Sequence, residues 1–311
     1  MSKELLFFVN PNAGRNDMRN HLMDVLAEFG AGGWRIVVHP THEPREITRV
    51  IADQGGDYDM VVACGGDGTL NEAVNGLMQL PPERQPILGY IPSGTVNDFA
   101  TSLRISKNIP TAARDIVTGR PFACDMASFG DTCFTYVAAF GAFTAVSYGT
   151  PQEQKQVLGR AAYLLEGIRS LNRIRPYHVR VEHDGETIED DVILGMVTNA
   201  TSVGGFKSMV ADAALMDDGL NEVVLVKAVK TAADLNRLAN SVLRWDMDPD
   251  QFIWFQTDNV RITFDEDVPW TLDGEFGGSV RDVVIRNIPR AVRIMVPQDQ
   301  ALPALDKAPE E

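Results

Sequence analysis

The chain has 311 residues, of which 44% are apolar and 23% charged, and its formal net charge is −15. This length is sufficient for two domains with full cores, and the composition is typical of a globular protein that folds in water. The acidic excess argues against general nucleic-acid binding, which requires a basic surface, and against adsorption of the whole surface to anionic membranes.

Strands and helices alternate through the first third of the chain. Apolar runs predict the strands, and apolar residues at helical spacing predict the helices between them. Strands are expected at residues 5–9, 34–38, 60–64 and 87–91, with helices at about 18–29, 44–52 and from 70 onward. This alternation predicts an N-terminal α/β domain, residues 1–121, built on a doubly wound parallel sheet.

The pattern changes after Pro121, where strands follow one another with little helix between them. They are expected at 122–129, 132–139, 177–183, 187–198, 221–226, 256–264 and 280–286. This succession predicts a mainly antiparallel β-sandwich domain over residues 122–290, interrupted by helices at about 154–172 and 231–245. A last strand at 291–296 is a candidate to return to the first domain, and residues 298–311 are expected to form a flexible tail.

A glycine-rich turn, residues 65–69, follows the third predicted strand and leads into a helical pattern. Glycines let the backbone turn tightly and approach a ligand, and the free N–H groups that start a helix favour a phosphate. The turn therefore predicts a phosphate site at the carboxyl end of a strand, where open α/β sheets bind ligands. The alternative is a glycine-rich turn that binds nothing, since the spacing matches neither the P-loop nor Gly-x-Gly-x-x-Gly.

A second glycine turn follows the fourth predicted strand, with Thr95, Asn97 and Asp98 after Gly94. A capped helix start would explain Asn97 and Asp98 by themselves. It does not explain why Gly and Thr recur together at the ends of two neighbouring strands. The recurrence predicts that both turns face one crevice at the same edge of the sheet.

Two acidic stretches in the second half are candidates for metal binding and proton transfer. In residues 215–220, a carboxylate beside a glycine turn with free carbonyls suits a hard ion such as Mg²⁺, although a plain hairpin turn has the same composition. In residues 270–275, Asp273 and Glu275 lie on one face if the segment is extended. A carboxylate pair near a hydroxyl suits proton abstraction, and the alternative is an exposed acidic turn.

Five motifs occur in an order that resembles a known family. They are Asn10-Pro11-x-Ala13-Gly14, Gly65-Gly66-Asp67-Gly68-Thr69-x-Asn71-Glu72, Gly94-Thr95-x-Asn97-Asp98-Phe99-Ala100, Asp217-Asp218-Gly219-Leu220 and Leu272-Asp273-Gly274-Glu275. Together they resemble the diacylglycerol kinase catalytic-domain family, and especially its soluble bacterial lipid kinase branch. The resemblance covers nearly the whole chain and implies ATP-dependent phosphorylation of a lipid hydroxyl, in a cleft between an α/β domain and a β-sandwich domain.

The resemblance also implies roles for individual residues. The residues expected to bind the nucleotide are Asn10, Thr41, Gly65, Gly66, Asp67, Gly68, Thr69, Leu70, Asn71, Glu72 and Thr95. Asp273 and Glu275 fall on the acidic catalytic motif, as general base and its partner, with the proton acceptor left open. Asp218, with the backbone carbonyls of Leu215 and Leu220, falls on the family's structural Mg²⁺ site; the adjacent Asp217 leaves open which carboxylate is the ligand.

The favoured function is transfer of the γ-phosphate of ATP to a lipid hydroxyl, with conversion of diacylglycerol to phosphatidic acid as the first candidate. Mg²⁺ is the expected cofactor, because phosphoryl transfer depends on positioning and charge neutralisation. One alternative is an NAD kinase, which shares the first glycine turn but not the motifs at 94–100 and 272–275. The other is a non-catalytic regulator that binds a nucleotide or a lipid.

A cytoplasmic protein is expected from three cysteines without a pairing pattern, no signal peptide and no apolar run of 18 residues. Because the acyl chains of a lipid substrate stay in the bilayer, peripheral contact with the inner membrane face is expected. The candidate surfaces are the apolar stretch 203–207 and the basic helix at 154–172 with its flanks, which carry Lys155, Arg160, Arg169, Arg173 and Arg175. No nucleic-acid partner is expected, and the sequence leaves a homodimer open.

Overall fold

The N-terminal part of the protein is a parallel sheet with helices on both sides. A computed structural model describes residues 3–10, 17–142, 175–203, 206–207, 214–244 and 246–298. The first four strands are β1 (Lys3–Val9), β2 (Trp34–Pro40), β3 (Met60–Gly65) and β4 (Ile87–Pro92). They lie in the order β2-β1-β3-β4, and every neighbouring pair is parallel.

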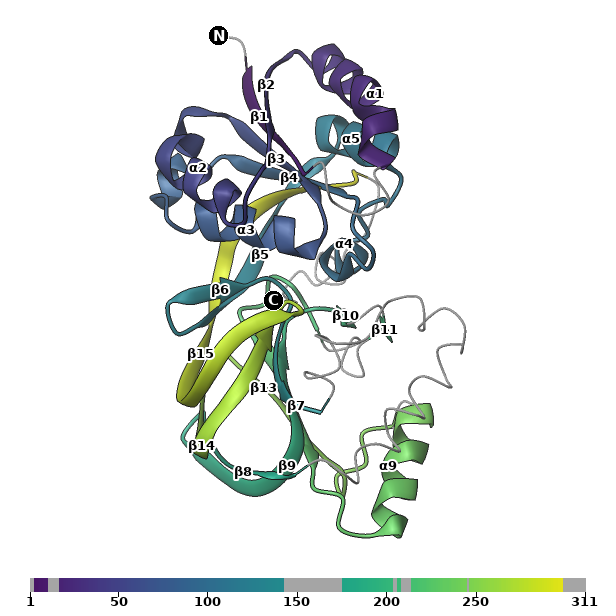
Figure 1. Cartoon of the computed structure of the whole chain (residues 1–311), viewed down its shortest axis with the longest axis vertical. Coiled ribbons are helices and arrows are strands. Elements are labelled where there is room, and N and C mark those ends of the chain that lie inside the picture. Colours follow the sequence, from purple (N-terminus) through teal and green to yellow (C-terminus); the bar gives the residue numbers. More distant parts are fainter. Residues whose placement is uncertain are drawn as a thin grey trace, which may run out of the picture.

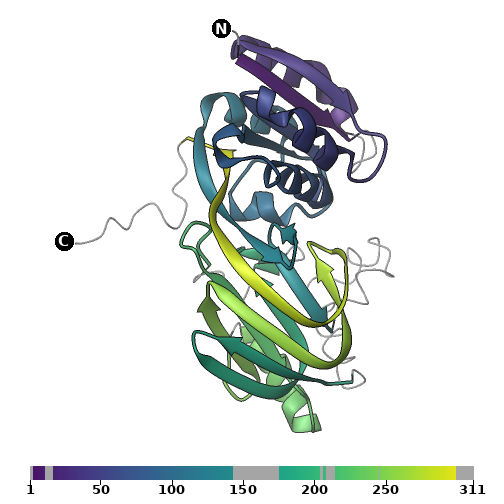
Figure 2. The same cartoon turned by 90° about the vertical axis from the view of Figure 1, so that its left-hand side faces the viewer.

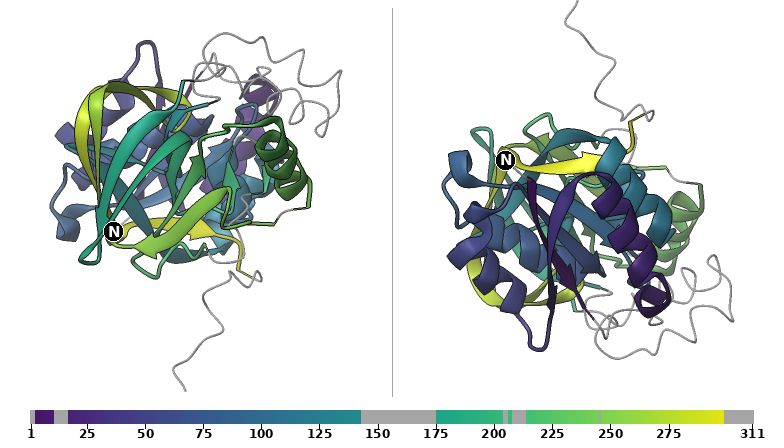
Figure 3. Two further views of the ribbon diagram at one scale, coloured as in Figure 1. Left: turned by 90° about the horizontal axis from the view of Figure 1, so that it is seen from below. Right: turned by 90° about the horizontal axis from the view of Figure 1, so that it is seen from above.

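Two pairs of helices cover this sheet. Helices α1 (Asp17–Ala31) and α5 (Ile109–Thr118) pack together on one face, and α2 (Glu46–Gln54) and α3 (Asp67–Leu77) pack together on the other (Figure 3). Because both faces are covered, β1 and β3 carry runs of buried apolar side chains rather than alternating ones. Three short helical turns complete this part: η1 (Gly55–Asp57), η2 (Pro82–Arg84) and α4 (Asp98–Ser102).

The C-terminal part is rich in antiparallel strands, as Figure 1 shows below the helices. Its strands are β5 (Arg120–Phe129), β6 (Thr132–Phe134), β7 (Val137–Gly141), β8 (Tyr177–His183), β9 (Glu186–Thr198), β12 (Asn221–Lys227), β13 (Phe252–Thr257), β14 (Asn259–Leu272) and β15 (Glu275–Val296). A two-stranded sheet pairs β10 (Ser202–Val203) with β11 (Phe206–Lys207), and helix α9 (Ala232–Arg244) packs over β12 and β9. The core on the other face centres on Phe140, Phe264 and Trp270, whose rings lie 4.8–6.2 Å apart.

The long strand β15 joins the two parts. It pairs with β14 and β5 in the C-terminal part and continues beside β4, where Ile294 pairs with Leu88 in parallel orientation. Figure 2 shows β15 and β5 running together from one part into the other. The sequence predicted separate strands at 280–286 and 291–296; they are one strand, with a register shift between Ile288 and Val292.

Three sequence-based expectations are wrong in detail. The expected strand 132–139 is two strands, because residues 135 and 136 leave the ladder between β6 and β7. The expected strand 256–264 spans β13 and β14, which are separated at Asp258. Residues 273–275 are not extended: Asp273 and Gly274 have φ values of 50° and 86° and form the hairpin turn between β14 and β15. Asp-Gly suits such a turn because both residues tolerate a positive φ.

The expected membrane-contacting segments lie largely outside the described residues. This holds for the helix at 154–172, for Lys155, Arg160, Arg169 and Arg173, and for residues 204 and 205 of the stretch 203–207. Arg175 is described, and its guanidinium forms an ion pair with Glu266 at 3.2 Å. Within the ranges that the structure describes, no helix is long and apolar enough to cross a membrane.

Candidate active site

A cleft of about 510 Å³ lies where the carboxyl ends of β1 to β4 meet the hairpin between β14 and β15. It is lined by Asn10, Thr41, His42, Glu43, Pro44, Ile47, Gly66, Gly68, Thr69, Glu72, Gly94, Thr95 and Glu275. Both glycine turns and one residue of the acidic pair therefore meet at one site. The volume is within the usual range for small-molecule sites.

The two glycine turns are in direct contact. Ser93 N donates to Gly65 O at 2.9 Å, and a Cβ at Gly94 would lie only 2.4 Å from Gly66 Cα. A side chain at position 94 would force the two turns apart, so glycine is required there for steric reasons. Gly66 is the N-cap of α3 and has no side-chain cap, which leaves the first N–H groups of the helix available to an anion.

Two glutamates hold the loop between β2 and α2, which forms another wall of the cleft. The Glu72 carboxylate accepts hydrogen bonds from Arg45 N at 2.9 Å and Ile47 N at 3.3 Å. The Glu46 carboxylate accepts from His42 N at 2.6 Å and Glu43 N at 3.1 Å, and its other oxygen lies 2.9 Å from His39 Nε2. These backbone N–H groups, followed by the His39 contact, lower the pKa of Glu46 to about 2.

The Asp273 carboxylate is buried and accepts five hydrogen bonds. Its Oδ2 accepts from Asn71 Nδ2 at 2.7 Å, Thr135 N at 2.7 Å and Thr135 Oγ1 at 2.8 Å. Its Oδ1 accepts from Tyr136 N at 2.9 Å and Val137 N at 3.1 Å. Burial raises the pKa of Asp273 above its usual range, and the hydrogen bonds from residues 135–137 oppose this rise.

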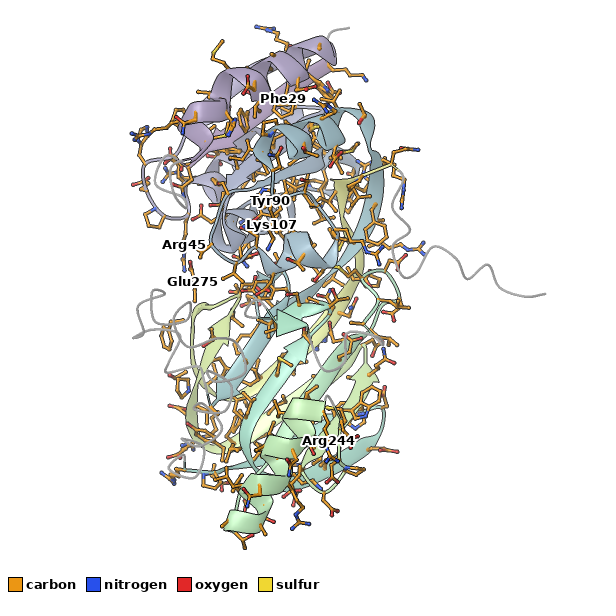
Figure 4. All side chains as sticks on the ribbon, turned by 90° about the vertical axis from the view of Figure 1, so that its right-hand side faces the viewer. Phe29, Arg45, Tyr90, Lys107, Arg244 and Glu275 are labelled. Atoms are coloured by element: carbon orange, nitrogen blue, oxygen red, sulfur yellow. The ribbon has the colours of Figure 1, made fainter. Side chains whose placement is uncertain are left out.

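Glu275 has a different environment from Asp273, although only one residue separates them. Its side chain is exposed and lines the cleft, and a Cβ at Gly68 would lie 2.9 Å from its Oε1. Figure 4 shows Glu275 below Arg45, at the level where the two parts of the molecule meet. The carboxylate thus lies against the first turn of α3, where a phosphate would be bound.

Asp67 is a further acid next to this site. It accepts hydrogen bonds from the backbone N–H groups of Asp98 and Phe99, and the Asp98 carboxylate in turn accepts from Ser202 Oγ at 2.7 Å. Burial, and then the charges of Asp98 and Asp273, raise the pKa of Asp67 to about 6. Carboxylates gathered beside a cleft provide negative charge suited to a bound cation.

The remaining expected nucleotide-binding residues lie behind the lining of the cleft. Gly65 ends β3, and a Cβ added at this position would lie 2.1 Å from Thr69 Oγ1. Leu70 is fully buried in the core. Asn71 points toward the C-terminal part, where its Nδ2 also donates to Cys133 O at 3.2 Å.

The expected metal loop, residues 215–220, lies away from the cleft and next to Asp125. The Asp125 carboxylate accepts from Gly219 N at 2.7 Å and from Arg290 N at 2.6 Å. Burial raises the pKa values of Asp125, Asp217 and Asp218, and Asp218 is raised further by the charges of the other two. The part of the chain that the structure describes contains no group of three His, Cys, Asp or Glu side chains that could hold a metal ion.

The oxygens of this loop nevertheless fit a hard cation. Asp217 Oδ1 is buried and has no hydrogen-bond partner among the described residues, whereas Asp218 Oδ1 accepts from Leu220 N at 3.0 Å. The Leu220 carbonyl accepts from Asn287 Nδ2 at 3.0 Å, and each carbonyl oxygen has a second lone pair. Two carboxylates with raised pKa values and backbone carbonyls are the ligand type that Mg²⁺ and Ca²⁺ prefer.

Sequence reasoning missed the backbone of residues 135–137, Glu46 and Asn75, which all shape the site. Three of the four donors from residues 135–137 are backbone N–H groups, which have no signal in the sequence because any residue supplies one; the fourth is the Thr135 hydroxyl. The helical spacing of Asn71 and Asn75 (i, i+4) would have placed both amides on one face of α3.

This arrangement of glycine turns at a helix N-terminus beside an acidic hairpin is that of a kinase. Residues 4–129 match the family model described as the diacylglycerol kinase catalytic domain, and residues 139–296 match a YegS C-terminal NAD kinase beta sandwich-like domain. The chain is 33% identical to a diacylglycerol kinase of Bacillus subtilis (strain 168), over 96% of this chain and 98% of the relative. It is 30% identical to a diacylglycerol kinase of Staphylococcus carnosus (strain TM300), over 96% and 97%.

Solved structures agree. A crystal structure of a diacylglycerol kinase from Bacillus anthracis str. Sterne is similar with a TM-score of 0.77 at 25% identity, covering 95% of this chain and 97% of that one. A second crystal structure from the same organism, suggested to be a diacylglycerol kinase, has a TM-score of 0.82 at 26% identity and the same coverage. The chain belongs to the diacylglycerol kinase catalytic-domain family and is a kinase of the lipid kinase type.

Proposed function

We propose that the protein transfers the γ-phosphate of ATP to the hydroxyl of a lipid, with diacylglycerol as substrate and phosphatidic acid as product. The observation that carries this proposal is the cleft, where both glycine turns, one of them at the N-terminus of α3, meet the Glu275 carboxylate. Family membership and relatives named diacylglycerol kinase support the substrate class. An α/β domain over residues 1–121, doubly wound and joined by strand 291–296, would bind the nucleotide; residues 122–290 would supply the acidic hairpin.

The nucleotide phosphates are assigned to the first turn of α3 and to Thr95. No lysine lies in either glycine turn, so backbone N–H groups of residues 66–69 and the Thr69 hydroxyl supply the donors. Asn10, Thr41 and the loop held by Glu46 and Glu72 would contact the rest of the nucleotide. Glu72 would act by holding this loop, since both of its oxygens accept backbone hydrogen bonds.

Glu275 is the proposed proton acceptor, with Asp273 as the residue that fixes the hairpin. A carboxylate has about four lone-pair sites, and five donors occupy those of Asp273. Glu275 faces the cleft and is free to approach a hydroxyl. In the step, the lipid oxygen bonds to the γ-phosphorus, the bond from phosphorus to the β,γ-bridging oxygen breaks, ADP leaves, and the hydroxyl proton passes to Glu275.

Mg²⁺ is proposed at two places. On the nucleotide it would neutralise the charge of the β- and γ-phosphates, and the Asp67 carboxylate next to the cleft would orient water around it. A second, structural ion would be held by Asp218 with the carbonyls of Leu215 and Leu220, and the unpaired Asp217 oxygen supports a cation there. Neither place has the tight all-protein ligand cage that would bind an ion without water.

The test is phosphorylation with γ-labelled ATP of diacylglycerol, monoacylglycerol, a sphingoid base, ceramide and NAD in parallel. Labelled phosphatidic acid is expected, and the Glu275→Gln variant should form less than about 1% of it, because the general base contributes about 10²–10⁴-fold. Labelled NADP would favour the NAD kinase. ATP binding without labelling of any acceptor would favour the non-catalytic regulator.

Peripheral contact with the membrane is the part of the proposal that concerns location. Docking through the basic segment 154–175 should increase with anionic lipid and decrease with salt, because each basic residue near the surface contributes about 1 kcal/mol, screened over roughly 8 Å. Co-sedimentation with vesicles measures this docking, and we expect it to weaken in the double variant Arg160→Glu with Arg169→Glu. Equal binding to neutral and anionic vesicles at every salt concentration would leave apolar insertion instead.

A further inference from the structure

Helix α3 and strand β6 are joined by the carboxamide of one residue, Asn75. Its Nδ2 donates to Cys133 O at 3.0 Å, and Cys133 N donates to its Oδ1 at 3.1 Å, so it pairs with both backbone groups of Cys133 as a strand residue would. The Nδ2 also lies 2.9 Å from Asn71 O and 3.0 Å from Asn71 Oδ1. Asn71 and Asn75 are one helical turn apart, and both amides converge on the Cys133 carbonyl.

Cys133 begins the segment that holds Asp273. Two residues later the chain leaves the ladder between β6 and β7, and there Thr135, Tyr136 and Val137 give Asp273 four of its five hydrogen bonds. The carboxylate can accept them only if this irregular segment keeps its place relative to the hairpin. Asn75 fixes one end of the segment to α3, whose other end forms the phosphate turn.

We propose that Asn75 is a positioning residue for the reaction: it sets the acidic hairpin at the correct distance from the phosphate turn. This proposal rests on the function proposed above. α3 acts as a rigid spacer, with Gly68 against Glu275 at its first turn and Asn75 on β6 at its third. Asn71 makes the direct link to Asp273, and Asn75 makes the indirect link through Cys133 and residues 135–137.

Loss of Asn75 should loosen the segment without disturbing the nucleotide. Asn75 does not line the cleft, and its helix is anchored by the buried side chains of Ala73, Val74 and Leu77. The Cys133 N–H would lose its partner and the Cys133 carbonyl would keep only Asn71, so the segment after them would move by a fraction of an ångström or more. Because a misplacement of about 1 Å can cost roughly 100-fold in rate, turnover is the sensitive quantity.

The first test does not require any activity. Hydrogen exchange of the amides of residues 133–137 should be at least tenfold faster in Asn75→Ala than in the native chain, measured by mass spectrometry of peptides spanning them. Gln79→Ala is the matched control, since among the described residues the Gln79 carboxamide bonds only to Asn75 O, on the exposed side of the next turn. Unchanged exchange in Asn75→Ala would overturn the proposal.

The second test separates positioning from binding. In Asn75→Ala, kcat should fall about 10- to 100-fold, while the KM for ATP stays within threefold and Gln79→Ala behaves as the native enzyme. Asn75→Asp keeps the acceptor for Cys133 N but places a second oxygen, in place of the amide nitrogen, against Cys133 O. The aspartate has nearly the same volume as the asparagine, so this variant serves even if the alanine variant folds poorly. Its kcat should fall to a similar extent. A rise in KM for ATP with kcat unchanged in both variants would contradict the proposal.

The two proposals can fail separately. If the native chain phosphorylates no lipid, the proposed function is wrong, and the exchange experiment still decides whether Asn75 holds residues 133–137. If the native chain is active and both variants keep native kcat and native exchange, the function stands and the role of Asn75 is wrong.

Discussion

Asn71 Nδ2 donates a hydrogen bond of 2.7 Å to Asp273 Oδ2, although 202 positions separate the two residues in the sequence. Asn71 belongs to the helix that begins at the phosphate turn, and Asp273 belongs to the acidic hairpin. This contact brings the two halves of the candidate site together. It also makes Asp273 part of the scaffold of the site, because the same carboxylate holds the backbone of residues 135–137.

Asp273→Asn and Glu275→Gln make the same chemical change one residue apart, and we expect them to differ in stability. An amide nitrogen at position 273 would face at least two donors, and each buried donor left unpaired costs about 1–3 kcal/mol. Asp273→Asn should therefore lower the free energy of unfolding by roughly 2–4 kcal/mol as well as activity. Glu275→Gln should lose activity with an unchanged thermal melt, because its carboxylate is exposed.

Denaturant unfolding and turnover measured on the same preparations check this pair. Equal stability of the two variants would show that the hydrogen bonds to Asp273 contribute little. Native turnover in Glu275→Gln, combined with a native melt, would remove Glu275 from the role of proton acceptor.

Gly94→Ala should weaken nucleotide binding, because its Cβ would lie 2.4 Å from Gly66 Cα. That neighbour is backbone and cannot rotate away, so the two glycine turns must separate. We expect ATP affinity measured by calorimetry to fall at least tenfold. Gly30→Ala is the matched control, since a Cβ at position 30 meets nothing within 4 Å and helix α1 gains a better helix former. Native affinity in Gly94→Ala would mean that the contact between the turns does not matter.

The strands of the N-terminal sheet could be predicted from sequence, because parallel strands buried on both faces, such as β3 and β4, are continuous apolar runs. The two glycine turns could also be predicted from sequence, since few residues other than glycine tolerate such close backbone contact. The acidic hairpin was recognised as a motif, but its shape was not predicted. Asp273-Gly274 is a two-residue turn like Asp184-Gly185, where both residues also have a positive φ, and treating it as extended placed both carboxylates on one face.

The different environments of Asp273, which is buried, and Glu275, which is exposed, could not be predicted from sequence. They depend on the backbone N–H groups of residues 135–137, which donate to the Asp273 carboxylate where residues 135 and 136 leave the ladder. Long-range contacts of this kind have no local pattern. The same applies to β15, whose apparent break at residues 289–290 is a bulge that Asp125 stabilises through Arg290 N.

Glu222 should make the protein less stable as the pH rises. Its side chain is buried in β12, Gln256 Nε2 donates to Oε1 at 3.1 Å, and Oε2 has no partner among the described residues. Burial raises the pKa of Glu222 from 4.5 to about 8. The folded state therefore keeps a proton that the unfolded chain releases, so the stabilisation is complete below pH 4.5 and is lost as pH rises through about 8.

Glu222→Gln removes this titratable group, so the free energy of unfolding of the variant should depend less on pH. Between pH 5 and pH 9 the native chain is expected to lose more stability than the variant, by an amount on the order of a few kcal/mol at about 1.4 kcal/mol per pKa unit. The variant keeps the acceptor for Gln256, so the native chain and the variant should have similar free energies of unfolding at pH 5. Parallel curves of unfolding free energy against pH would contradict a raised pKa of Glu222.

The metal loop offers a test that does not depend on turnover. An ion that binds only the folded state raises the free energy of unfolding by RT ln(1 + [ion]/Kd), so saturating Mg²⁺ at 100 times Kd adds about 2.7 kcal/mol. Chelator should lower the melting temperature of the native chain, and in Asp218→Asn the melting temperature should be the same with chelator as with Mg²⁺.

Asp217→Asn distinguishes the two carboxylates. Asp217 Oδ1 is the buried oxygen without a partner, so a smaller effect of Mg²⁺ on the melting temperature of this variant would show that Asp217 is a ligand as well. Asp234→Asn is the control, because this carboxylate caps α9 through Thr231 N at 2.9 Å, away from the loop, and should leave the response to Mg²⁺ intact. If the melting temperature of the native chain changes with neither chelator nor Mg²⁺, the loop binds no ion, and its role is limited to the turn in which Asp218 holds Leu220 N and Asp125 holds Gly219 N.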